Sequence, residues 1–266
     1  MTPAAVGFQC PECLREGRAT VRGKTTPYGA RVVERAYATY TLIAVNVLVF
    51  LATLVSGGSS VAFGGGSSGL YDDLALTTRS YRYQDADGLV HTVGSVSGGQ
   101  YYRLATSAFM HAGLLHLAFN MLALLQLGPL LERLFGWWRF LAVYAVAGLG
   151  GSVATYLFAG EGTATVGASG AIFGLFAAYF VVARHTRSDT NQILLTIGIN
   201  LAITFAVPQI SKTGHLGGLA LGAIAGALVV YVPAGPRRTV VQVVGLVVLA
   251  AVLVAATLAR TAALTG

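Results

Sequence analysis

The sequence predicts an all-α fold, a polytopic membrane helical bundle of about seven transmembrane helices. Of its 266 residues, 55% are hydrophobic and only 10% are charged, whereas a typical soluble domain is about 25% charged. Long apolar runs recur along the chain, each near the roughly 17–25 residues that a helix needs to cross the hydrocarbon core. These runs lack the alternation that is typical of strands, and lipid favours helices because backbone groups must bond within the segment.

The apolar runs divide the chain into a tail, a core and one added helix. Residues 1–37 are a basic tail, residues 38–232 hold six runs with a long loop at 56–103, and residues 233–266 add a C-terminal helix. The first run begins too late, and lacks the cleavage-site flank, for a signal peptide. The seven runs lie near 38–55, 114–131, 138–158, 168–184, 191–207, 214–232 and 240–260.

Two polar segments lie outside the runs. In the tail, Cys10 and Cys13 form a single C-x-x-C, which is unlike a structural disulfide in a cytosolic segment. Zinc normally takes four ligands, and no second Cys/His pair lies nearby. We therefore favour an exposed turn over a zinc knuckle. A third alternative is that the protein starts further upstream and that the other zinc ligands lie in that segment.

The long loop begins with a flexible Gly/Ser linker at 56–69, and loops of this length are usually functional or disordered.

The lysines and arginines predict a cytoplasmic N-terminus and an external C-terminus. Twelve lie in the tail and in alternate short connections, against five on the opposite side, three of these in the long loop, where charge counts less. The net charge of +7 is therefore mostly a topology signal. Basic patches interleaved with aromatics are missing, which argues against nucleic-acid binding. We expect a multi-pass protein of the plasma membrane.

Polar side chains inside membrane segments are functional candidates, and in this sequence they gather at one depth. His111, His116 and Asn120 open the second run, and the last two are four residues apart on one helix face. Ser169 opens the fourth run and His215 the sixth. Because these three runs cross in the same direction, all five residues are expected near the outer face, although they were not used to assign the topology.

A serine and a histidine at the same depth suit nucleophilic catalysis. A histidine can accept the proton of the Ser169 hydroxyl, and His215 is the candidate base. The N-terminus of the fourth helix offers free N–H groups to a developing oxyanion, and His116 and Asn120 are candidates for further donors. No apolar run contains Asp or Glu, so a Ser–His unit here would be a dyad without an orienting carboxylate.

Small and aromatic neighbours are expected to shape this site. Gly167 and Gly170 flank Ser169 and leave room for a scissile backbone, while Phe173, one turn further, is placed to stack on the His215 imidazole. In the sixth run, glycines recur every four residues and form a smooth stripe that lets another helix approach closely. They are Gly214, Gly218, Gly222 and Gly226.

Three motifs together resemble the signatures of the rhomboid intramembrane serine proteases. They are H-x4-H-x3-N at 111–120, G-A-S-G at 167–170 and G-H-L-G-G at 214–218. Their order and placement match over about residues 38–232, and the seventh helix is an addition found in some members. Two positions depart from the family pattern: the loop motif Trp-Arg is Tyr102-Arg103, and Phe173 stands where many members have Tyr.

The resemblance implies a role for each candidate residue. Ser169 would be the nucleophile and His215 the general base, with His116, Asn120 and the Ser169 N–H as the oxyanion hole. His111 matches a position of more structural character. The implied substrates are single-pass or other transmembrane proteins in the lipid bilayer, cut near the outer face, and no cofactor is implied.

Two other classes of protein were weighed. A catalytically inactive relative that binds membrane clients is expected to have lost Ser169 or His215, and both are present. A transporter often has two related halves with interrupted helices, and we find no such halves. Other intramembrane proteases are disfavoured because the sequence has neither H-E-x-x-H nor a pair of membrane aspartates.

The topology is testable with Ser169→Cys in a chain whose Cys10 and Cys13 are replaced by serine. We expect the new thiol to react with a membrane-impermeant reagent added outside, because the charge bias puts residue 169 near that face. Labelling from the cytoplasmic side alone would contradict both the topology and the chemistry built on it.

Overall fold

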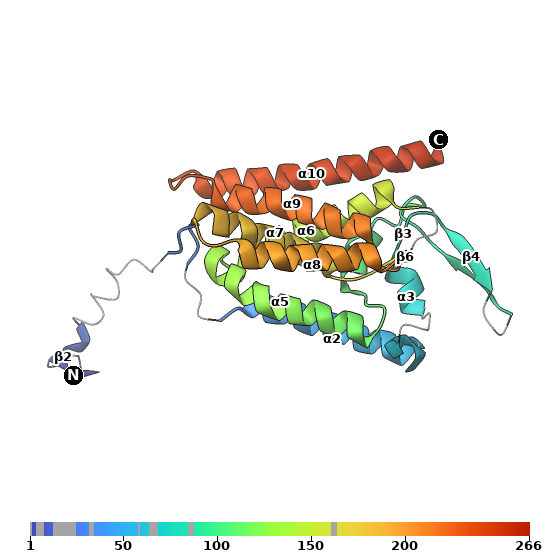
Figure 1. The fold of residues 1–266 in the computed structure, drawn as a ribbon, viewed down its shortest axis with the longest axis horizontal. Helices are drawn as coiled ribbons and strands as arrows, with labels where there is room; N and C mark the ends of the chain where they lie inside the picture. The colour runs from blue at the N-terminus through green and yellow to red at the C-terminus, as the bar shows by residue number, and fades with distance from the viewer. Residues whose placement is uncertain are drawn as a thin grey trace.

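The computed structural model describes residues 2–3, 8–12, 25–31, 35–57, 59–63, 69–84, 88–160 and 164–266. Among them, seven long helices run side by side along the long axis of the molecule (Figure 1). They are α2 (Tyr37–Gly57), α5 (Leu114–Phe135), α6 (Trp137–Phe158), α7 (Ser169–His185), α8 (Asn191–Ala206), α9 (Lys212–Val230) and α10 (Arg238–Thr265). Every expected run is found as a helix, and the prediction of an all-α membrane bundle is confirmed.

The helices differ in length. In the described part of the chain, five are long and apolar enough to cross a membrane, namely α2, α5, α6, α9 and α10. The helices α7 and α8 are also apolar but shorter, with 17 and 16 residues.

The connections contain short elements that the hydropathy pattern did not predict. The long loop is more ordered than a linker, although residues 58 and 64–68 of the expected linker lie outside the described residues. Its elements are η1 (Ser59–Phe63), α3 (Gly69–Leu74), β3 (Leu76–Thr77), β4 (Tyr81–Gln84), β5 (Val90–Val93), α4 (Arg103–Thr106) and η2 (Ser107–Phe109). β4 pairs with β5, and β3 pairs antiparallel with β6 (Ala164–Thr165), which ties the loop to the segment just before α7.

Part of the predicted tail packs on the bundle. The Tyr28 side chain is buried and meets the Phe135 ring edge-on, with ring centroids 5.5 Å apart. Further along the tail, β1 (Thr2–Pro3) pairs with β2 (Phe8–Gln9). Cys10 is half-buried and Cys13 lies outside the described residues, so the zinc alternative stays open. Elsewhere in the described chain, no group of three potential metal ligands is found.

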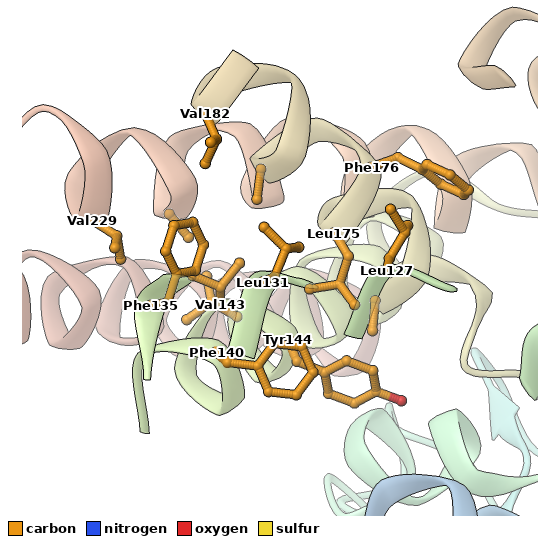
Figure 2. Packing of buried hydrophobic residues seen from close by; sticks show 14 of the residues in the cluster. Leu127, Leu131, Phe135, Phe140, Val143, Tyr144, Leu175, Phe176, Val182 and Val229 are labelled. Atoms are coloured by element: carbon orange, nitrogen blue, oxygen red, sulfur yellow. The ribbon is translucent and has the colours of Figure 1, made fainter. Parts of the chain in front are cut away.

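The main apolar core lies where α5, α6, α7 and α9 meet. Figure 2 shows Leu131 and Phe135 of α5 facing Val143 of α6, with Leu175 of α7 and Val229 of α9 closing the cluster. A smaller cluster joins Leu76 and Leu104 of the long loop to α6 and α10. The loop is thus held on the bundle by burial of apolar side chains as well as by strand pairing.

Helix α5 continues past the predicted end at residue 131 and so includes an acidic residue. Glu132 is buried, and its carboxylate accepts the backbone N–H groups of Ala38 and Thr39 at 2.9 and 2.8 Å and the Thr39 hydroxyl at 2.7 Å. These N–H groups lie in the first turn of α2, where they have no intrahelical acceptor and the helix dipole favours an anion. Glu132 therefore caps a neighbouring helix at the end of the bundle remote from Ser169.

The glycine stripe of α9 lies against α7, as the sequence predicted. A Cβ atom added at Gly218 would overlap the Gly170 carbonyl, and one at Gly222 would overlap the backbone of Gly174. The backbones of the two helices therefore touch along this line. Such contact requires small residues on the stripe, and it sets the spacing between the N-terminal ends of α7 and α9.

Gly222→Ala is expected to lower the free energy of unfolding by roughly 1–3 kcal/mol, because the added methyl group must separate two helices in backbone contact. Thermal unfolding in detergent measures the effect. Gly198→Ala is the matched control, since Gly198 is exposed in α8 with no atom within 4 Å of an added Cβ. Equal stability of the two variants would contradict the packing argument.

Candidate active site

The structure brings Ser169 and His215 together. Ser169 is the first residue of α7, and His215 lies in the first turn of α9. The Oγ atom of Ser169 is 2.7 Å from Nε2 of His215, which is hydrogen-bonding distance for a nucleophile and its base. The two residues are 46 positions apart in sequence, and the glycine contact between α7 and α9 is what brings their side chains together.

The turn before Ser169 is held by a glycine with an unusual backbone. Gly167 has φ +122°, which L side chains rarely adopt, and its N–H donates to the Ser107 carbonyl at 2.9 Å. The pairing of β3 with β6 fixes the preceding residues. The chain therefore enters α7 in a defined direction, with the Ser169 side chain directed at α9 and the first N–H groups of α7 left without intrahelical acceptors.

His215 is held in place by a contact on its ring and by a cap on its helix. The Phe173 ring stacks on the His215 ring with centroids 4.2 Å apart and an interplanar angle of 21°, in the arrangement that the spacing predicted. Upstream, Ser211 caps α9 by accepting the Gly214 N–H at 3.1 Å. The cap fixes the first turn of α9 and hence the backbone that carries His215.

The sequence analysis missed the second polar contact of His215. The Oγ1 atom of Thr204, in α8, lies 2.7 Å from Nδ1 of His215. The Thr204 hydroxyl also donates to the Asn200 carbonyl at 2.7 Å. That bond uses the only proton of the Thr204 hydroxyl. The hydroxyl oxygen can therefore only accept a hydrogen bond from Nδ1–H of His215. The neutral imidazole then has an unprotonated Nε2 facing the Ser169 hydroxyl, as a general base requires.

Thr204 lies near the end of its run, but nothing in the sequence separates it from other threonines in apolar helices. It is one of only two residues of α8 that are buried, the other being Ile193. A threonine that bonds the carbonyl four residues back is common in apolar helices, so the residue alone carries no signal.

His116 faces the same space as Ser169. A Cβ atom added at Gly167 would lie 2.7 Å from Nε2 of His116 and 3.6 Å from Oγ of Ser169. The His116 imidazole and the Ser169 hydroxyl therefore face the same small space beside Gly167. The Ala112 N–H donates to Nδ1 of His116 at 3.3 Å. In the neutral ring, Nε2 then carries the proton and is a hydrogen-bond donor.

His111 and Asn120 are not brought to this point. The Asn120 amide is buried and donates to the His116 carbonyl, one turn back, at 2.8 Å. His111 is fully buried with its ring edge-on to that of His116, the centroids being 5.1 Å apart. Neither residue lines the cavity at Ser169, so both contact the site through His116.

A cavity of about 620 Å³ opens at these residues and is lined by Ser169, His215 and His116. Its walls include Tyr71 from the long loop and residues 208–211 from the connection between α8 and α9. Among the described residues, no acidic side chain lines it. A smaller pocket of about 30 Å³ lies beyond Ser169, walled by Gly148, Gly151 and Gly170.

Arg103 supports the loop rather than the cavity itself. It is buried, and Nη1 donates to the carbonyls of Asp72 and Ala75 at 2.7 Å each, while Nε donates to Gln100 Oε1 at 2.6 Å. Asp72 follows Tyr71, which lines the cavity. The arginine that the sequence singled out therefore fixes the loop segment at the cavity mouth, a role its neighbour Tyr102 does not share.

Comparison with known proteins agrees with this geometry. The model of the Rhomboid domain family matches residues 98–232, about half of the chain. The chain belongs to the rhomboid family. The matched residues include all three rhomboid motifs, and the fold is that of a polytopic helical membrane protein.

Rhomboid relatives occur in bacteria and eukaryotes. The chain is 37% identical over 200 residues to rhomboid protease GluP of Bacillus subtilis, covering 71% of this chain and 34% of that protein. It is 31% identical over 147 residues to rhomboid-type serine protease 2 of Emericella nidulans, covering 53% and 29%. It is 37% identical over 132 residues to putative rhomboid protease YdcA of Bacillus subtilis, covering 48% and 66%. The chain spans about a third of the length of the first two.

Proposed function

We propose that this rhomboid chain is an intramembrane serine endopeptidase that cleaves transmembrane segments of other membrane proteins near the outer face. The observation that supports it best is the 2.7 Å contact between Ser169 Oγ and His215 Nε2. An inactive relative would have no need of this contact, nor of the bond from His215 Nδ1–H to Thr204 that leaves Nε2 free to accept a proton.

The proposed reaction proceeds through an acyl-enzyme. The Ser169 hydroxyl gives its proton to Nε2 of His215 while Oγ attacks the carbonyl carbon of the scissile peptide. The resulting oxyanion accepts hydrogen bonds from the Ser169 N–H and from Nε2–H of His116. His215 then protonates the leaving amine, and in the second half activates a water that hydrolyses the ester. Asn120 is proposed to act by holding His116 rather than by direct donation.

The cavity supports a class of substrate. A transmembrane helix presents carbonyls that are already bonded, so the cleaved segment must unwind before Ser169 can attack. Helix-breaking Gly or Pro is therefore expected near the cut. The 30 Å³ pocket beside Ser169 is lined mostly by glycine, alanine, serine and threonine, and its small volume suits a small side chain at the cleaved position.

Ser169→Ala and His215→Ala are each expected to abolish cleavage of a model single-pass substrate by the purified protein in detergent. The loss should be several orders of magnitude, because either change removes the covalent route. Ser188→Ala and His185→Ala are matched controls, since His185 is the exposed last residue of α7 and Ser188 is exposed in the turn that follows. A fluorophosphonate probe should label the unmodified chain and both controls but not Ser169→Ala. Full activity in either dyad variant would overturn the assignment.

Thr204→Val is expected to lower kcat about fivefold with little change in KM, since one hydrogen bond to the base is worth about 1 kcal/mol. Thr204→Ser should restore most of the rate. Thr196→Val is the matched control, because Thr196 makes the same bond to the carbonyl four residues back without touching His215. If both valine variants lose activity equally, Thr204 acts through helix α8 and not through the base.

A further inference from the structure

Three arginines gather at the end of the bundle opposite the dyad. A Cβ added at Gly29 would lie 3.6 Å from Nη2 of Arg139 and 3.6 Å from Nη1 of Arg238, so the two guanidinium groups face the same point. Arg237 is exposed beside them. Like charges this close repel one another unless an anion lies between or beside them.

The partners of these arginines within the described residues are neutral. Arg139 donates from Nε to Gln242 at 2.8 Å and from Nη2 to Thr239 at 3.3 Å. Arg238 donates from Nη1 to the Pro27 carbonyl at 2.7 Å, while its shielded Nε has no partner. Within the described residues these bonds orient the two groups without a carboxylate partner, and the Arg139 guanidinium also lies over the Trp138 ring, 4.3 Å from its centroid.

An apolar groove of about 620 Å³ begins at the same place. It is lined by the last turns of α9, the connection at 231–237 and the first turn of α10. Ile224, Ala227 and Leu228 form one wall and Val241 contributes to the other. Apart from Tyr231, Arg237 and Arg238 at its end, the groove is lined by residues without polar side chains. A phenol and two guanidinium groups thus lie at the mouth of an apolar channel.

We propose that this groove binds an anionic phospholipid, with its phosphate at Arg237 and Arg238 and an acyl chain along α9 and α10. Guanidinium groups form charge-assisted hydrogen bonds with phosphate oxygens, and basic pockets between transmembrane helices on the cytoplasmic side bind anionic headgroups. The apolar walls accept the acyl chain, so a soluble phosphate would use only part of the site. This inference does not depend on the proposed protease activity.

The proposal is tested on the full chain, purified in non-ionic detergent and depleted of lipid. Phosphatidylglycerol is titrated, and bound lipid is counted by native mass spectrometry. We expect saturable binding of one molecule, no comparable binding of phosphatidylcholine, and no competition from inorganic phosphate. The double variant Arg237→Gln and Arg238→Gln should weaken binding roughly thirtyfold, about fivefold for each arginine.

Two further variants make the result specific to the groove. Arg184→Gln with Arg187→Gln removes two exposed arginines from the same end and should leave the affinity unchanged. Ala227→Phe fills the apolar wall and should weaken phosphatidylglycerol binding with every arginine present, which keeps the proposal testable if the double variant does not fold. Equal affinity for phosphatidylcholine, or unchanged binding in Ala227→Phe or in the Arg237/Arg238 variant, would overturn it.

Discussion

The backbone contact between α7 and α9 is the constraint on which the site depends. Ser169 and His215 lie on different helices, and both have short reach, so their contact requires helix axes closer than ordinary side chains allow. Gly174 and Gly222 remove the side chains from that interface. In lipid, where apolar burial gives no net drive for association, close packing of this kind is itself a main source of helix affinity. The spacing that packs the helices is also the spacing that the chemistry needs.

Around this contact, two buried charged side chains are matched with neutral hydrogen-bonding partners. Glu132 takes up N–H groups of α2, and Arg103 takes up carbonyls of the long loop. In a membrane an unmatched group of this kind would cost several kcal/mol, so each pairing restricts how its segments can lie. Glu132 acts at one end of the bundle and Arg103 at the other. The positions of α2 and of the loop are therefore determined by polar contacts, whereas α7 and α9 are positioned by packing.

The helices could be predicted from the sequence, and so could the proximity of Ser169, His215 and His116. The reason is that the length, hydropathy and crossing direction of each run set the depth of its residues in the membrane. The sequence was less informative about which groups these side chains bond. Thr204 carries no pattern that separates it from any threonine in an apolar helix, and Arg103 binds backbone carbonyls, which every residue possesses. Asn120 is expected to donate to the oxyanion, and the sequence did not show that its amide also bonds the His116 carbonyl of its own helix. Depth can be read from composition, whereas the direction of a side chain depends on neighbours that are distant in sequence.

The unequal helix lengths bear on the bilayer itself. At a rise of 1.5 Å per residue, the 16 residues of α8 extend about 24 Å and the 28 residues of α10 about 42 Å, on either side of a hydrocarbon core near 30 Å. Lipids beside α8 therefore meet a shorter apolar wall than lipids beside α10. The apolar height that the protein offers to lipid thus changes around its circumference, and it is least along the helix that carries Thr204.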